Sequence, residues 1–168
     1  MNNHLTGTVA QEHFRINYTA LTDPGCRRFH NEDAFLVDEA EFLFGVADGV
    51  GSLGNGEIAS RMTVDSVIGH LQRERATFSG HISLLLDQAV AAANRAVYDY
   101  GAVQGRRIAS TLCCIALAKD EVFVVNIGDS RAYRWRHHQL SQLTTDHTLK
   151  QEMLDNGIVA DVKKKPFH

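Results

Sequence analysis

Cysteine is scarce in this sequence, long apolar runs are missing, and positive and negative charges nearly balance. The three cysteines are an odd number without regular spacing, which argues against a disulfide framework. Cys113 and Cys114 stand side by side in an apolar run, so we expect them to be buried in a strand rather than reactive. No apolar run reaches the roughly 18 residues that a transmembrane helix needs.

The charge balance also limits the partners of the protein. A net charge of −3, from 17 basic and 20 acidic residues, is too small to indicate nucleic acid or an anionic membrane as a partner. Residues 1–11 lack a basic stretch followed by an apolar one, which predicts no signal peptide and a cytoplasmic protein.

What the sequence does contain is typical of one globular domain. A length of 168 residues suits a single domain, and 44% hydrophobic with 22% charged residues is an ordinary globular composition. We expect residues 1–12 to be a flexible N-terminus and residues 158–168 to be an irregular or disordered tail.

The first third of the chain predicts strands. Apolar and polar residues alternate over 14–20, which is the period of a half-buried strand. Apolar runs at 34–37 and 42–47 predict a hairpin, joined by the acidic stretch 38–41. The glycine-rich stretch 48–56 predicts a tight loop in place of regular structure.

The rest of the chain predicts two helices and then further strands. Apolar residues repeat at helical spacing from residue 57 to 71 and from 82 to 103. Four strands and a last short helix are expected at 110–118, 122–127, 132–136, 139–143 and 147–156. This order favours an α+β architecture with antiparallel sheets.

Three acidic sites lie at the ends of predicted strands or next to turns: Asp33 after Glu32, Asp48 before a glycine, and Asp129 in a turn. Burying an unpaired carboxylate costs free energy, and divalent cations such as Mg²⁺ or Mn²⁺ could neutralise the charges of all three sites together. Arg28 is close by in the sequence and could grip a phosphate through two hydrogen bonds. Such a set would suit phosphate-ester hydrolysis by metal-activated water, although turn chemistry alone also explains each site.

Five motifs of the sequence resemble those of bacterial protein phosphatases of the PP2C type, which are metal-dependent serine/threonine phosphatases. In the family's order, they are RFHNED at 28–33, VADGVGS followed by GE and AS at 46–60, AST at 109–111, NIGDSRAY at 126–133 and LTTDHT at 143–148. The resemblance implies an α-β-β-α sandwich, in which two antiparallel sheets are flanked by helices and a metal site lies at one end. It also implies a phosphoserine or phosphothreonine protein as substrate, produced by a cognate serine/threonine kinase.

The same resemblance implies the cofactors and the roles of the residues. Two Mn²⁺ or Mg²⁺ ions would activate a bridging water that attacks phosphorus directly, and a third ion would bind more weakly. The implied residues are Asp48 bridging the two metals, Gly49 offering its carbonyl, Asp33 and Glu32 holding a metal or its waters, Asp129 at the weaker site, and Arg28 on the substrate phosphate.

The sequence also departs from the family pattern. Val50 replaces a histidine that animal members use as a proposed general acid, which points to the bacterial type, and Ser52 replaces a glycine. His30 and His147 are alternative proton donors. The family's last two metal-binding aspartates have no counterpart before His168, so we expect the fold to be incomplete at its C-terminus.

These departures leave three interpretations open. The first is a phosphatase whose activity depends on how complete the metal site is. The second is a pseudophosphatase that binds a phosphoprotein or a kinase with weak or no turnover. The third is a shortened chain that folds poorly because its sheet edges are exposed.

Overall fold

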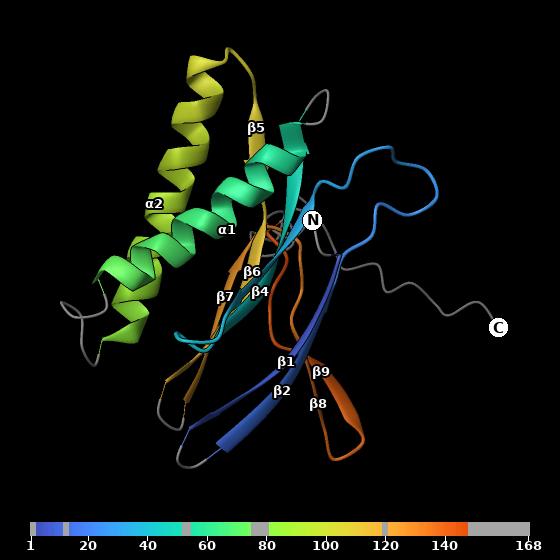
Figure 1. Cartoon of the computed structure of the whole chain (residues 1–168), viewed down its shortest axis with the longest axis vertical. Helices are drawn as coiled ribbons and strands as arrows, with labels where there is room; N and C mark the ends of the chain where they lie inside the picture. Colours follow the sequence, from blue (N-terminus) through green and yellow to red (C-terminus); the bar gives the residue numbers. More distant parts are fainter. Residues whose placement is uncertain (1–2, 12–13, 52–54, 75–80, 119–120, 148–168) are drawn as a thin grey trace, which may run out of the picture.

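The computed structural model describes residues 3–11, 14–51, 55–74, 81–118 and 121–147. At its centre is a five-stranded antiparallel sheet, and two helices lie together on one side of it (Figure 1). The main path of this sheet has the order β3-β4-β6-β7, and β5 pairs with the end of β4. The strands are β3 (Asp33–Asp38), β4 (Leu43–Gly51), β5 (Ile108–Ser110), β6 (Leu112–Ala118) and β7 (Glu121–Ile127).

Two further hairpins stand outside this sheet. They consist of β1 (His4–Gln11) with β2 (Phe14–Leu21), and β8 (Tyr133–Arg136) with β9 (Gln139–Gln142). The exposure of β2 alternates residue by residue, as its sequence period predicts. Thus, every sheet among the described residues is antiparallel.

The core lies between the central sheet and the helices α1 (Asn55–Glu74) and α2 (Ile82–Val103). The sheet contributes Leu36 and Leu43, which are fully buried against the helices. The repeat of apolar residues along each helix gives it one buried face, and burying one leucine in this way contributes about 1.5–3 kcal/mol. Neither of the two described helices is long and apolar enough to cross a membrane.

The opposite face of the central sheet is only partly covered by the residues that the structure describes. The β1–β2 hairpin reaches it through Tyr18, whose ring lies 5.0 Å from that of Phe44. Val46 and Val122 on this face remain 46% and 56% exposed. The molecule therefore has one well-packed layer of helices and a second side where apolar side chains meet solvent.

The α+β architecture with antiparallel sheets is confirmed. The helix predicted at 82–103 forms over that range, and the predicted 34–47 hairpin corresponds to β3 and β4. Two expectations differ from the structure. Residues 4–11 form β1 where we expected a flexible segment, because they pair along their whole length with β2.

The loop expected at 48–56 is also wrong in its first part. Strand β4 continues through Gly51, because Gly49, Val50 and Gly51 pair with β5. Asn55 already opens α1, so regular structure occupies both ends of the glycine-rich stretch. Residues 52–54, the helix expected after His147 and the tail at 158–168 lie outside the described residues.

Candidate active site

Asp33 and Asp48 are directly opposite each other in the β3–β4 pairing. Paired residues of antiparallel strands point to the same face, with Cβ atoms about 4.5–5.5 Å apart. Burial and then the negative charge of Asp48 raise the pKa of Asp33, and the charge of Arg28 opposes this shift. The strand register thus creates a pair of like charges that a bound cation would relieve.

This carboxylate pair lines a cavity of about 330 Å³ at one end of the sheet. Thr22 from the end of β2 and Ser130 from the turn after β7 line the same cavity. The walls therefore come from four segments that are distant in the sequence.

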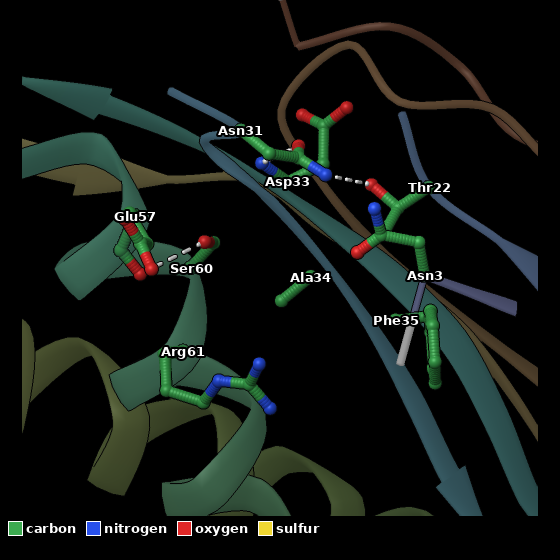
Figure 2. A pocket seen from close by; sticks show the side chains of 9 residues that line it. All are labelled: Asn3, Thr22, Asn31, Asp33, Ala34, Phe35, Glu57, Ser60 and Arg61. Atoms are coloured by element: carbon green, nitrogen blue, oxygen red, sulfur yellow. Dashed lines mark hydrogen bonds between the residues drawn. The ribbon is translucent and has the colours of Figure 1, made fainter. Parts of the chain in front are cut away.

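A second cavity, of about 480 Å³, shares Thr22, Asp33, Ala34 and Phe35 with the first. Figure 2 shows it between α1, which carries Glu57 and Arg61, and the strand that carries Asp33 and Phe35. Asp33 therefore borders both the cavity at the sheet end and the cavity beside the first turns of α1.

Asn31 orients the segment that leads into Asp33. The Asp33 N–H donates to Asn31 Oδ1 at 3.0 Å, and Asn31 Nδ2 donates to Thr22 Oγ1 at 2.8 Å. An asparagine that accepts from the backbone two residues on forms a local turn of its own. This turn fixes the direction in which the chain enters β3, and with it the position of Asp33.

Glu32 connects the carboxylate pair to Arg28 through a backbone hydrogen bond on one side and an ion pair on the other. Its carbonyl oxygen accepts a hydrogen bond from Gly49 N–H at 3.0 Å. A Cβ atom on Gly49 would fall far inside contact distance of the Gly56 carbonyl oxygen, so only glycine fits there. Arg28 Nη1 lies 3.4 Å from Glu32 Oε2, and the Arg28 side chain remains 63% exposed. The ion pair holds this guanidinium near the site and leaves it open to a ligand.

The backbone of Asp48 is held by Thr111, a residue to which the sequence assigned no role. Thr111 N–H donates to the Asp48 carbonyl at 2.9 Å, and Asp48 N–H donates to Thr111 Oγ1 at 2.9 Å. Thr111 Oγ1 lies 2.7 Å from Ser130 Oγ. Both residues lie in motifs that resemble the family, AST at 109–111 and NIGDSRAY at 126–133, but nothing in the sequence predicts the contact between them.

Asp129 lies exposed on the turn after β7, next to Ser130. Gly128 has a φ of 96°, a conformation that favours glycine, and its carbonyl accepts from His147 N–H at 2.8 Å. The His147 ring nitrogen Nδ1 accepts from Gly128 N–H at 3.4 Å. His147 is thus bound to this turn, which gives it a structural role.

The structure therefore brings Asp33 and Asp48 together, with Glu32 and Gly49 directly behind them. Within the described residues, no group of three or more His, Cys, Asp or Glu side chains is arranged to hold a metal ion. The two facing carboxylates fit part of a site for a divalent cation, because such ions prefer carboxylate oxygens. Asp129 is connected to this pair through Ser130 and Thr111 and does not join it as a third ligand.

Together the fold and the carboxylate pair define an α+β protein with a candidate divalent-cation site at one end of its sheet. The model of the family "Protein phosphatase 2C" matches residues 27–154. The chain therefore belongs to the protein phosphatase 2C family.

Similar proteins agree with this assignment. The serine/threonine protein phosphatase PstP of Mycobacterium tuberculosis is 33% identical over 144 residues, which are 84% of this chain and 27% of PstP. The serine/threonine phosphatase stp of Listeria monocytogenes is 31% identical and is matched over 83% of this chain and 58% of its own length. Both are bacterial proteins, as the sequence predicts.

A solved structure shows the same fold. It is the catalytic domain of the serine/threonine protein phosphatase PstP in complex with two manganese ions, with a TM-score of 0.71 and 28% identity. The match covers 94% of this chain and 61% of that one. This chain thus spans about three fifths of the catalytic domain that it resembles.

Proposed function

We propose that this chain takes part in the hydrolysis of phosphoserine and phosphothreonine in proteins, with Mn²⁺ or Mg²⁺ as cofactor. The observation that carries the proposal is the Asp33–Asp48 pair facing a cavity in a chain of the protein phosphatase 2C family. The two manganese ions of the similar PstP domain support the choice of cation. Two ions are proposed here, with a third and weaker site near Asp129.

Each residue has a distinct part in this proposal. Asp48 would hold both ions and Asp33 would hold one of them or its waters; the strand register, which puts both carboxylates on one face of the sheet, supports this. Glu32 and the carbonyl of Gly49 would complete this side of the site; the hydrogen bond from Gly49 N–H to the Glu32 carbonyl keeps the two residues together. The exposed guanidinium of Arg28 binds and orients the phosphate of the substrate. When bound, the ions would supply an activated water at neutral pH and neutralise charge on the phosphoryl oxygens.

The test is hydrolysis of an aryl phosphate and of a phosphothreonine peptide by the purified chain, with Mn²⁺ and with a chelator. We expect turnover only with the metal, and we expect Asp48→Asn to abolish it. Asp65→Asn, on an exposed position of α1, is the matched control and should keep wild-type activity. Turnover that survives the chelator or the Asp48→Asn change would refute the proposal.

Absence of turnover with Mn²⁺ would leave the binding alternative, which calorimetry with the phosphothreonine peptide then decides. The cytoplasmic location and the cognate kinase stay predictions.

A further inference from the structure

At Thr111, one regular sheet hydrogen bond is replaced by one that the side-chain oxygen accepts. In an antiparallel ladder, two hydrogen-bonded partners exchange backbone N–H and carbonyl groups. Here Thr111 N–H donates to Asp48 as expected, but Asp48 N–H donates to Thr111 Oγ1 in place of a carbonyl. The Thr111 carbonyl instead accepts from Ser110 Oγ at 2.8 Å. The central sheet is interrupted at this residue, between β5 and β6, so the side chain of Thr111 itself fixes the backbone of Asp48.

The same side chain supports the turn that carries Asp129. Thr111 Oγ1 and Ser130 Oγ are 2.7 Å apart, and one of the two hydroxyls donates to the other. A Cβ on Gly128 would lie 2.7 Å from Thr111 Cγ2, so the threonine methyl group packs against the turn. Thr111 thus contacts the residues on both sides of Asp129, and His147 holds the turn from another segment.

The contacts connect two places that are far apart in the sequence. Thr111 is buried, and Ser130 lines the cavity that also contains Asp33 and Asp48. The hydrogen bond from Asp48 to Thr111 spans 63 residues, and the one from Thr111 to Ser130 spans 19. Removing either hydroxyl would therefore affect the cavity through these contacts, without altering a carboxylate.

We propose that Thr111 and Ser130 act as a positioning pair, which fixes Asp48 relative to the turn carrying Asp129 and thereby sets the affinity of the site for divalent cations. The cation part of this inference rests on the proposed function. The mechanical part, that the two hydroxyls hold the Asp48 backbone, rests on the hydrogen bonds alone. Partners that orient a metal ligand commonly change metal affinity by roughly 10- to 100-fold when they are lost.

Calorimetry of Mn²⁺ binding to the purified chain tests the cation part. Thr111→Val keeps the shape and removes the hydroxyl, and we expect it to weaken Mn²⁺ binding by about 10-fold. Thr111→Ser keeps the hydroxyl and should retain near wild-type affinity. Ser130→Ala should also weaken Mn²⁺ binding. Because the two hydroxyls act as one pair, the double variant should bind Mn²⁺ about as weakly as Thr111→Val alone. Thr8→Val, which removes a hydroxyl hydrogen bond in the β1–β2 hairpin, is the matched control and should have no effect.

Hydrogen exchange of the Asp48 amide, followed by NMR without metal, tests the mechanical part. Thr111→Val should speed this exchange by roughly 5-fold or more, because its acceptor is lost, and Ser130→Ala should speed it less. If the wild-type chain binds no Mn²⁺, the proposed function fails, and the exchange measurement still decides whether the pair holds Asp48. Wild-type exchange and wild-type Mn²⁺ affinity in Thr111→Val, or in Ser130→Ala, would overturn the positioning pair.

Discussion

The charge of Asp48 opposes folding of the metal-free protein, because Asp48 faces Asp33 across β3 and β4. We therefore expect Asp48→Asn to raise the thermal unfolding midpoint in the presence of a chelator. The raised pKa of Asp33 means that its carboxyl favours the folded state at low pH and loses this contribution as the pH rises through its folded pKa. The gain in the variant should thus grow as the pH rises from about 4 through the raised folded pKa of Asp33, as scanning calorimetry would show.

A change at Asp65, on an exposed position of α1, gives the comparison for this measurement. Asp65→Asn removes the same charge from the molecule without relieving a carboxylate pair, so its midpoint should move much less. A lower midpoint for Asp48→Asn at neutral pH would show that the two carboxylates do not repel each other in the folded chain.

Two glycines should respond to alanine in opposite directions. Gly49→Ala would drive a Cβ atom into the Gly56 backbone, and such overpacking typically costs about 1–3 kcal/mol. Gly69 lies within α1, where the nearest atom to a new Cβ is the flexible end of Arg73 at 3.1 Å. Gly69→Ala should therefore stabilise the chain by roughly 0.5–1 kcal/mol through helix propensity. Urea unfolding measures both changes in the free energy of unfolding. A loss of stability in Gly69→Ala would contradict the predicted opposite signs.

The β8–β9 hairpin is closed at its base by an ion pair between residues on either side of it. Arg131 Nε donates to both carboxylate oxygens of Asp146, at 2.8 and 3.0 Å, and Arg131 Nη2 contacts the same carboxylate. Hydrogen bonding from Arg131 lowers the pKa of Asp146 in the folded chain. The stability that this pair contributes is present above the unfolded pKa of Asp146 and is lost as the pH falls through the lowered folded value.

Asp146→Asn should accordingly lower the thermal unfolding midpoint at neutral pH. The difference from wild type should shrink as the pH falls below about 4 and vanish once the carboxyl is protonated in both states. Asp99→Asn, on an exposed position of α2, supplies the charge-matched reference. A difference that stays constant down to the lowest pH would mean that Asp146 acts through packing and not through its charge.

Elements with a long and regular pattern could be predicted from the sequence. The apolar repeat of α2 and the alternation in β2 depend on neighbours within a few residues, and both formed as expected. The stretch at 48–51 could not be predicted in this way. Its glycines favour a loop locally, but pairing with β5, about sixty residues further along the chain, makes it the end of β4.

The residues of the candidate site likewise fall into those that the sequence could single out and those that depend on the tertiary fold. Asp33 and Asp48 could be singled out from the sequence, because each stands beside an apolar run, and the register then places them opposite each other. The roles of Thr111 and Ser130 could not, since a hydroxyl near a strand is common and its partner is set by the tertiary fold. The roles in binding stay predictions for all six residues: Arg28, Glu32, Asp33, Asp48, Gly49 and Asp129.

Binding of Mn²⁺ should stabilise the entire chain, because the site joins segments from β3, β4 and the turn after β7. A ligand that binds only the folded state adds about 2.7 kcal/mol at a free concentration 100 times its dissociation constant. We expect the unfolding midpoint to rise with Mn²⁺ concentration in the wild type, and to stay flat in Asp48→Asn. Calorimetric scans at increasing Mn²⁺ concentrations provide the test, with Ca²⁺ as a second ion. An unfolding midpoint that does not change with Mn²⁺ would contradict the proposed site.

The three thiols of the protein differ sharply in their surroundings. Cys113 and Cys114 are buried in β6, and burial raises the pKa of Cys114 to about 12, whereas Cys26 is exposed. Because thiolates are the reactive form, a maleimide dye added at neutral pH would label Cys26 and spare the other two. The wild-type chain therefore carries a ready attachment point two residues before Arg28, where a fluorophore could report the arrival of a phosphorylated ligand without any engineered cysteine.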